Sequence, residues 1–469
     1  MNEKMLPGDF TQYMETFMGE PLWTILKNGL MDDPPVSIRM NPFKASDMTV
    51  NDGVPVPWCR QGWYLPNRPV FTSDPLFHAG AYYVQEASSM FLDTVLREYV
   101  QEPVKMLDLC AAPGGKSTVA RAALPSGSVL VSNEPIRKRA QILVENLQKF
   151  GHADVIVTNN YPHDYASSDL SFDVILADVP CSGEGMFRKD VEAIGEWSRQ
   201  QVEKCWHLQR EIVTEAWNCL CPGGLLIYST CTFNALEDEE NVRFIRDVLG
   251  AEILPVSVDP SWNITGSLVK EFQEPVYRFL PGKTKGEGLF MALLQKKDEF
   301  AIIGKTNTKE RNRREKQQRR ETAPEWLAHA DDFDFVQQGG RMRAIPKRWR
   351  QFYDQTVKSL HVLHAGVAIG EMKGKDLVPD PSLALSVDRH PKAFPTVELT
   401  MEEAVSYLRR EPLPGMPDRP RGFVVVSCMG LALGFLKNLG TRTNNPYPQE
   451  WRIKSTYIDS PSRIIHRNL

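Results

Sequence analysis

The sequence predicts an α/β protein built on a mostly parallel sheet. Between residues 104 and 297, short apolar runs rich in β-branched residues alternate with amphipathic helical stretches, which is typical of right-handed βαβ units. The runs are almost continuously apolar, and this indicates strands buried on both faces of the sheet. They are Lys105–Leu109, Ser128–Ser132, Val155–Thr158, Asp173–Ala177, Leu225–Ser229 and Leu289–Leu294.

The flanking segments differ in texture from this α/β domain, which we place at residues 101–297. Residues 1–100 mix short helical patterns with proline-rich turns and predict an α+β region. Residues 298–322 contain the run Lys305–Arg320, whose many basic residues and lack of apolar periodicity indicate a flexible basic linker. Residues 323–396 predict a small α/β domain, and residues 397–469 carry short β-like runs and turns.

One helix of the α/β domain is predicted with particular detail. The stretch Ile136–Lys149 places four apolar residues at helical spacing, which predicts a single buried face. The four are Ile136, Ala140, Leu143 and Leu147.

Composition excludes several classes of protein. The chain has 469 residues, of which 42% are hydrophobic and 24% charged, with a net charge of −4. This balance argues against a uniformly basic nucleic-acid binder, although it allows a local basic patch. No apolar run reaches the roughly 18 residues of a membrane span. Residues Met1–Phe10 lack the pattern of a signal peptide, so we expect a cytoplasmic protein with no membrane partner.

The eight cysteines favour neither a disulfide scaffold nor a metal site. No two of them have the C-x-x-C spacing of a structural zinc site, so we expect no metal. Most are predicted to be small buried hydrophobic residues. These are Cys59, Cys205, Cys219, Cys221 and Cys428.

A small-residue loop follows the first predicted strand and precedes a helix that begins near Lys116. Small residues let the backbone approach a ligand, and a helix N-terminus offers free N–H groups. The loop is not a P-loop, because Cys110 stands where that motif needs glycine, and Pro113 interrupts the amide donors. The loop, in which a backbone can approach a ligand closely, includes Cys110, Ala111, Ala112, Pro113, Gly114, Gly115 and Lys116.

An acidic residue, Glu134, follows the second strand. At this position a carboxylate can accept hydrogen bonds from ribose hydroxyls. The alternative is a helix cap. A ribose acid beside a loop that has neither a phosphate cradle nor a G-x-G-x-x-G motif favours S-adenosylmethionine as the cofactor over a nucleotide.

Two cysteines follow the ends of two later strands. Cys181 lies in Asp178-Val179-Pro180-Cys181, and Cys231 follows Ser229-Thr230. If the strands have the order 3-2-1-4-5, these ends are neighbours and both thiols face one crevice. A thiol suits methylation of a pyrimidine at C5, which becomes nucleophilic only after a nucleophile adds to C6. Asp178 lies at the same edge, and each cysteine alone could equally be a buried thiol.

Together these motifs resemble the NOL1/NOP2/Sun family of RNA cytosine-5 methyltransferases. The resemblance extends from Ser37 to about Lys297 and includes Ser37–Pro42, Tyr83–Met90 and Lys283–Phe290. Farther on, Ala365–Gly370 and Asn444–Pro448 look like the C-terminal extension of the bacterial F-type 16S rRNA methyltransferases. The family implies a Rossmann-like class I methyltransferase domain, an N-terminal RNA-binding region and a PUA-like RNA-binding domain at residues 397–469.

The resemblance also implies a role for each site residue. Cys231 matches the nucleophile that adds to C6, and Cys181 matches the thiol that assists product release. The loop from Cys110 to Lys116 and Glu134 match the cofactor site, and Asp178 matches an acid shared by cofactor and cytosine. Many relatives carry an aspartate near the adenine where this chain has Asn159-Asn160-Tyr161-Pro162, so we assign no residue there.

The resemblance implies that the partner is RNA, namely 16S rRNA or the small ribosomal subunit, and not DNA. A DNA cytosine-5 methyltransferase would use the Pro-Cys thiol alone, so the second thiol argues against it. A tRNA methyltransferase and a non-catalytic ribosome-assembly factor remain alternatives. Two basic and aromatic sets are candidate RNA contacts, although each of their residues could equally belong to the core or to the surface. They are Arg39, Trp58, Arg60, Trp63, Tyr64 and Arg68, and Arg341, Arg343, Lys347, Arg348, Trp349 and Arg350.

Overall fold

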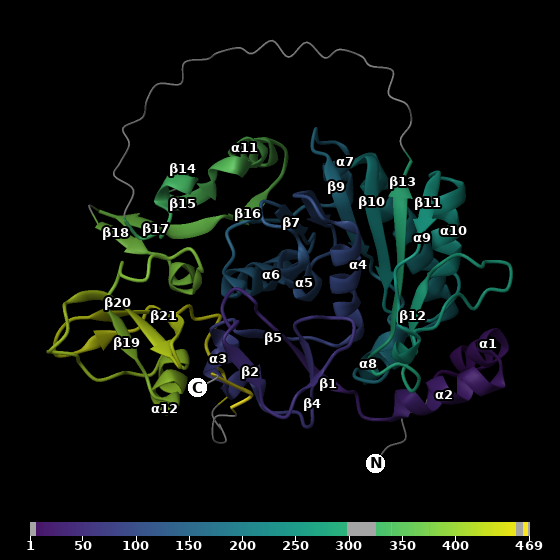
Figure 1. Ribbon diagram of the computed structural model, residues 1–469, viewed down its shortest axis with the longest axis horizontal. Helices are drawn as coiled ribbons and strands as arrows, with labels where there is room; N and C mark the ends of the chain where they lie inside the picture. The colour runs from purple at the N-terminus through teal and green to yellow at the C-terminus, as the bar shows by residue number, and fades with distance from the viewer. Residues whose placement is uncertain (1–5, 298–324, 339, 375, 456–462, 468–469) are drawn as a thin grey trace, which may run out of the picture.

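The computed structural model describes residues 6–297, 325–338, 340–374, 376–455 and 463–467 (Figure 1). The predicted basic run Lys305–Arg320 lies outside these residues. No helix of the described segments is both long and apolar enough to cross a membrane. The same segments contain no group of three or more histidine, cysteine or acidic side chains that could hold a metal ion.

A long central sheet has the strand order β11-β13-β10-β9-β6-β7-β8-β16. The five neighbouring strands β8, β7, β6, β9 and β10 are parallel. Their order confirms the predicted 3-2-1-4-5 arrangement, which places the ends of β9 and β10 side by side. β13 is antiparallel to β10 and also pairs with β11 and β12. The bounds are β6 Lys105–Asp108, β7 Val129–Asn133, β8 Val155–Thr158, β9 Phe172–Asp178, β10 Leu220–Thr230, β11 Ala251–Leu254, β12 Tyr277–Phe279, β13 Leu289–Lys296 and β16 Val362–Ala365.

Helices cover both faces of this sheet and produce the mixed α/β fold that the sequence predicts. They are α4 Leu92–Tyr99, α5 Gly115–Ala123, α6 Arg137–Phe150, α7 Pro162–Ala166, α8 Val191–Glu196, α9 Arg199–Asn218 and α10 Glu239–Asp247. In α6, Ala140, Leu143 and Leu147 are buried as expected. The prediction for Ile136 was wrong: it precedes the helix in an extended conformation, and its side chain is 54% exposed.

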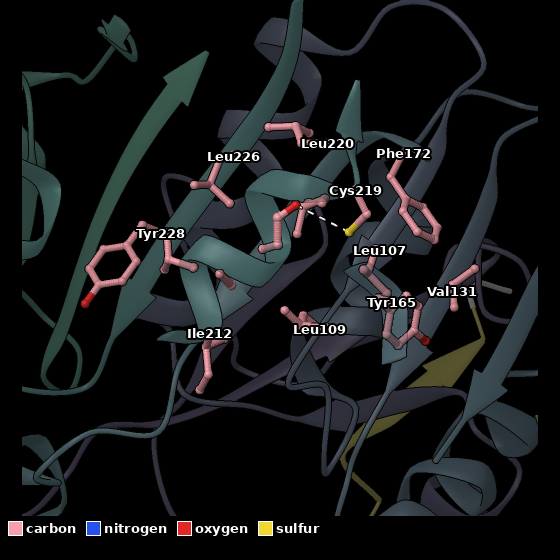
Figure 2. Packing of buried hydrophobic residues seen from close by; sticks show 14 of the residues in the cluster. Leu107, Leu109, Val131, Tyr165, Phe172, Ile212, Cys219, Leu220, Leu226 and Tyr228 are labelled. Carbon is pink, nitrogen blue, oxygen red and sulfur yellow. Dashed lines mark hydrogen bonds between the residues drawn. The ribbon is translucent and has the colours of Figure 1, made fainter. Parts of the chain in front are cut away.

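Apolar clusters fill the space between the sheet and its helices. Figure 2 shows one of them, in which Leu107 and Leu226 of the sheet pack with Ile212 of α9. Cys219 lies in this cluster, and its thiol donates to the carbonyl of Ala216. Cys59, Cys205 and Cys428 are also buried, which confirms the prediction for four of the five thiols. Cys221 is only partly buried, because it lies near the start of β10 at the end of the sheet.

The N-terminal residues form three α-helices, a separate antiparallel sheet of order β3-β4-β1-β5, and a further strand, β2, outside that sheet. Arg39, Trp58 and Tyr64 are buried here, so for these three residues the core alternative holds and the RNA contact does not. The guanidinium of Arg39 donates hydrogen bonds to the side chains of Gln85 and Thr118. Because Thr118 belongs to α5, these bonds connect this sheet to that helix. The bounds are α1 Gly8–Met18, α2 Glu20–Met31, β1 Val36–Met40, β2 Met48–Val50, β3 Val54–Pro55, β4 Gly62–Leu65, α3 Pro75–His78 and β5 Tyr82–Val84.

The residues after 324 form two further sheets, seen beside the central sheet in Figure 1: the first is antiparallel, and the second is mixed because β19 runs parallel to β20. The first has the order β14-β15-β17-β18, and it lends β16 to the central sheet, where β16 pairs with β8. The second has the order β19-β20-β21-β22. The bounds are β14 Phe333–Gln338, β15 Arg341–Pro346, α11 Arg350–Ser359, β17 Val367–Lys373, β18 Asp376–Pro379, β19 Thr396–Glu398, α12 Met401–Leu408, β20 Gly422–Cys428, β21 Leu431–Asn438 and β22 Thr443–Asn444.

The last described strand, β23 at Ile465–Arg467, returns to the N-terminal region and pairs with β2. The chain is thus joined to itself at two places that the sequence did not predict. One is the β16–β8 pair, and the other is this β23–β2 pair. Both add an antiparallel partner to a strand that precedes it by many residues.

Candidate active site

The small-residue loop connects the end of β6 to the start of α5. Gly114 adopts a left-handed backbone conformation with φ 112°, which glycine accommodates without strain. Gly115 begins the helix, so the first amides of α5 face the loop. Below the loop, the hydroxyl of Ser117 donates to Asp108 at 2.6 Å. Burial is the main cause that raises the pKa of Asp108 to about 7.

Glu134 follows β7 beside this loop. Its side chain is only 1% exposed, accepts from the amide of Ile136 at 2.9 Å and lies 3.5 Å from Arg139. Arg139 also donates to the carbonyl of Ala112, so it contacts both the acid and the loop. The side chain of Asn159 donates to the carbonyl of Glu134. Asn159 thus supports the acid from the segment in which many relatives carry an aspartate.

Asp178, at the end of β9, joins the loop to the neighbouring strand. Its Oδ2 lies 2.9 Å from Nζ of Lys116, and its Oδ1 accepts from the hydroxyl of Ser229 at 2.7 Å. Burial alone would lower the pKa of Lys116, but the charge and hydrogen bond of Asp178 outweigh it and raise the pKa. Lys116 also interacts electrostatically with Cys231. Asp178 remains 29% exposed, so a ligand can reach this carboxylate.

The two predicted thiols meet at the ends of adjacent strands. Sγ of Cys181 lies 2.9 Å from Sγ of Cys231, although fifty residues separate them in sequence. The hydrogen bond to Cys231, followed by burial, raises the pKa of Cys181 well above its usual value. Cys181 therefore holds its proton at neutral pH. Two thiols in contact can divide the work of one reaction between a nucleophile and a proton-bearing partner.

Residues that sequence reasoning missed hold the thiol segments in place. Glu184 and Glu237 are fully buried and accept backbone amides of these segments. Arg278 of β12 is buried as well, pairs with Asp238 at 2.8 Å and donates to the carbonyl of Phe233. The acidic run Glu237-Asp238-Glu239-Glu240 so soon after Cys231 was the available signal, because such a run at a strand end is unusual unless it binds internal donors.

These features fit an S-adenosylmethionine-like cofactor. One carboxylate oxygen of Asp108 is buried and has no hydrogen-bond partner within the described residues. The backbone at Gly114 is left-handed, and a side chain there would crowd Leu143 of α6 at 3.2 Å. A close backbone approach, free helix amides and an acid at the next strand end are what a nucleoside-bearing ligand without a phosphate chain requires.

The second set of predicted RNA contacts is largely at the surface. Arg341, Lys347 and Arg348 are exposed, although Arg348 also pairs with Asp154 at 2.6 Å. Arg343 is partly buried and donates to the carbonyl of Leu363, so it holds the backbone near β16. In the N-terminal set, Arg60 and Arg68 are exposed and Trp63 is partly buried.

Three family models match the chain. "16S rRNA methyltransferase RsmB/F" matches residues 95–295, "N-terminal domain of 16S rRNA methyltransferase RsmF" matches residues 6–87, and "Methyltransferase RsmF PUA domain" matches residues 394–453. Similar curated proteins bear the name ribosomal RNA small subunit methyltransferase F. The protein of Aliivibrio fischeri is 30% identical over 88% of this chain and 90% of its own length. That of Cronobacter sakazakii is 30% identical over 84% of each chain.

Solved structures share the fold of somewhat more than half of the chain. NSun6 from Pyrococcus horikoshii, crystallised with SFG, is 19% identical with a TM-score of 0.52, and the match covers 62% of this chain and 99% of that one. A methyltransferase homologue from the same organism is 23% identical with a TM-score of 0.53 and covers 62% and 95%. At such identities the likeness concerns the fold alone.

Proposed function

Because the chain belongs to the ribosomal RNA small subunit methyltransferase F family, an S-adenosylmethionine-dependent family, we propose that it methylates C5 of a cytosine in 16S rRNA. The observation that carries the C5 specificity is the contact between the thiols of Cys181 and Cys231 at the ends of β9 and β10. Methylation of an exocyclic amine needs no thiol, whereas C5 must first be activated by addition at C6.

Cys231 is the proposed nucleophile. Its thiolate adds to C6 of a cytosine that has left the base stack, at an unstacking cost of a few kcal/mol. The new S–C6 bond shifts electron density toward C5. Asp178 holds the N3 and N4 edge of the base, and Lys116 fixes the orientation of Asp178 through their 2.9 Å contact. The nucleophile is assigned to Cys231 because it stands at the position of the nucleophile in the Thr-Cys motif that the chain shares with its family.

Cys181 is the proposed assistant of product release. Once C5 carries the methyl group, a base removes the C5 proton. The electron pair of that C–H bond restores the C5–C6 double bond, and Cys231 leaves as a thiolate. The position of Cys181 at 2.9 Å from the leaving sulfur supports its role in this step.

The cofactor residues hold S-adenosylmethionine, which supplies the methyl group from its sulfonium. We propose that the backbone from Cys110 to Lys116 lies against its methionine part and that Glu134 binds its ribose. In this arrangement Asp178 lies at the junction of cofactor and base. No residue is assigned to the adenine.

The terminal regions are the proposed RNA contacts. We keep the division into residues 1–100, 101–297, 298–322, 323–396 and 397–469 as a proposal, with RNA binding by the first and the last of these. An rRNA substrate agrees with a cytoplasmic location. A tRNA substrate or a non-catalytic assembly role remains the alternative outcome of the test.

The test is bisulfite sequencing of total RNA from a deletion strain and its parent. We expect the loss of one or more protected cytosines in 16S rRNA, restored by the wild-type gene and not by Cys231→Ala. A loss confined to tRNA would contradict the substrate and keep the chemistry. Unchanged protection in all RNA would contradict the proposed activity.

A further inference from the structure

The two thiol segments are tied to each other by a pair of buried glutamates. We propose that Glu184 and Glu237 are positioning residues that form a reciprocal clasp, which keeps Cys181 within reach of the adduct formed by Cys231. The part of this inference that concerns the adduct rests on the proposed function. The part that concerns the distance between the two thiols does not.

Glu184 belongs to the Cys181 segment and binds the Cys231 segment. Its Oε2 accepts from the amides of Phe233 at 2.7 Å and Asn234 at 3.1 Å. The hydroxyl of Thr232 donates to the same oxygen at 2.5 Å. Glu184 therefore spans from one thiol segment to the three residues that follow the other thiol.

Glu237 makes the opposite connection. It follows Cys231 in sequence, and its Oε2 accepts from the amide of Ser182, the residue directly after Cys181, at 3.0 Å. Gln209 of α9 donates to the same oxygen at 2.6 Å, and Asn234 donates to Oε1 at 2.8 Å. Each thiol segment thus contributes one carboxylate and at least one amide to the other.

The energetics indicate that this arrangement serves position more than stability. Two buried carboxylates close together are costly: burial, followed by the charge of Glu184, raises the pKa of Glu237 to about 7. Apolar side chains would fill the same space at less cost, but they would not fix a direction. Charge-assisted bonds to backbone amides are directional. The clasp therefore fixes the backbone that carries both sulfur atoms.

A backbone contact reinforces the clasp. The amide of Gly185 donates to the carbonyl of Cys231 at 2.8 Å. A Cβ atom at Gly185 would lie only 2.7 Å from that oxygen, so the two segments are as close as backbones can be. Without the carboxylates, this bond and the hydroxyl contact between Ser182 and Thr232 at 3.1 Å would remain, together with the longer bond from Asn234 to Ser182 at 3.5 Å. We expect the loops then to separate enough for Cys181 to lose contact with Cys231, while Cys231 still reaches the base.

The first experiment measures thiol proximity without any substrate. Diamide, a diazene oxidant, accepts two electrons and two protons from two thiols and leaves a disulfide. Peptide mapping by mass spectrometry then follows the Cys181–Cys231 bond among the eight cysteines. We expect Glu184→Gln and Glu237→Gln to form it about tenfold more slowly than the wild type. The matched control is Glu240→Gln in α10, because the carboxylate of Glu240 pairs with Arg243 at 3.1 Å on the helix surface, and Arg210 donates to its main-chain carbonyl, which the substitution keeps.

The second experiment compares adduct with turnover. Under steady-state turnover of 16S rRNA, denaturing gels report the fraction of protein bound covalently to RNA. We expect this fraction to rise in both clasp variants while kcat falls, as in a mild form of Cys181→Ala. A purely structural defect would lower adduct and kcat together and leave their ratio unchanged.

Unchanged cross-linking rates in both variants, or an adduct-to-turnover ratio equal to that of Glu240→Gln, would overturn the clasp. If a glutamine variant does not fold, Thr232→Val removes one donor to Glu184 and keeps both carboxylates. It is expected to slow cross-linking about twofold to threefold, and an unchanged rate would overturn the role of Glu184. Absence of any adduct in the wild type would contradict the proposed function, and the cross-linking rates would still decide the clasp.

Discussion

The cofactor half and the thiol half of the site are built in different ways. The cofactor half is one continuous stretch, Cys110–Lys116, in which small residues and a left-handed glycine present backbone groups. The thiol half combines side chains from segments fifty residues apart, aligned by buried carboxylates. Backbone sites tolerate changes of side chain but not changes of φ. Sites made of side chains depend on partners that are remote in sequence.

The strongest test of this comparison is the division of labour between the thiols. Cys231→Ala should lower turnover by about a thousandfold or more and abolish the covalent adduct, because the nucleophile is lost. Cys181→Ala should also stop turnover but leave a stalled protein–RNA adduct. Denaturing gels with labelled 16S rRNA distinguish the two results. Adduct at the wild-type level in Cys231→Ala would reverse the assignment.

A second test uses the residue that links the two halves. Lys116 belongs to α5 and contacts Asp178, so Lys116→Gln should lower kcat about a hundredfold by releasing that carboxylate. The affinity for S-adenosylmethionine, measured by calorimetry, should change far less. The exposed Arg137→Gln of neighbouring α6 is the control. A loss of cofactor affinity as large as the loss in kcat would place Lys116 in the cofactor half alone.

Gly114→Ala should affect the cofactor half alone. A β-carbon at φ 112° is strained by roughly 1–3 kcal/mol, and it would also crowd Leu143. We expect cofactor affinity to fall about tenfold or more, while diamide cross-links Cys181 to Cys231 at the wild-type rate. Gly195→Ala, on a helix with open space around that position, serves as the control. Slower cross-linking in Gly114→Ala would show that the halves are not independent.

The last test concerns stability and pH and does not involve activity. Burial raises the pKa of Asp108 from its usual 3.8 to about 7, so the folded state binds this proton more tightly than the unfolded state. Its contribution to stability is therefore full below pH 4 and is lost as the pH rises toward 7. The free energy of unfolding of Asp108→Asn, relative to that of the wild type, should therefore increase by up to about 1.4 kcal/mol for each pH unit across this window. Urea unfolding at pH 5 and pH 7 measures the difference in free energy of unfolding between the variant and the wild type. The same difference at both pH values would contradict the raised pKa of Asp108.

The features of this molecule that could be predicted from the sequence are those that depend on residues close to one another in the chain. The apolar runs at β6, β7, β8, β9 and β10 indicated a parallel sheet. The strand order typical of such sheets makes the ends of β9 and β10 neighbours, and this predicted the contact between Cys181 and Cys231. The clasp of Glu184 and Glu237 was out of reach, because each carboxylate meets its amides through the tertiary fold. The burial of Arg39 could not be decided for the same reason, since its partner Thr118 lies 79 residues away.

The β23–β2 pair has a consequence for biosynthesis. Residues 48–50 leave the ribosome early, but their antiparallel partner at 465–467 is made more than 400 residues later. Domains generally fold during synthesis in order from the N-terminus, at about 5–20 residues per second. The edge of β2 therefore waits at least about 20 s for its partner. Through that interval the nascent chain presents an unpaired strand edge, the kind of surface on which strands of other chains can add.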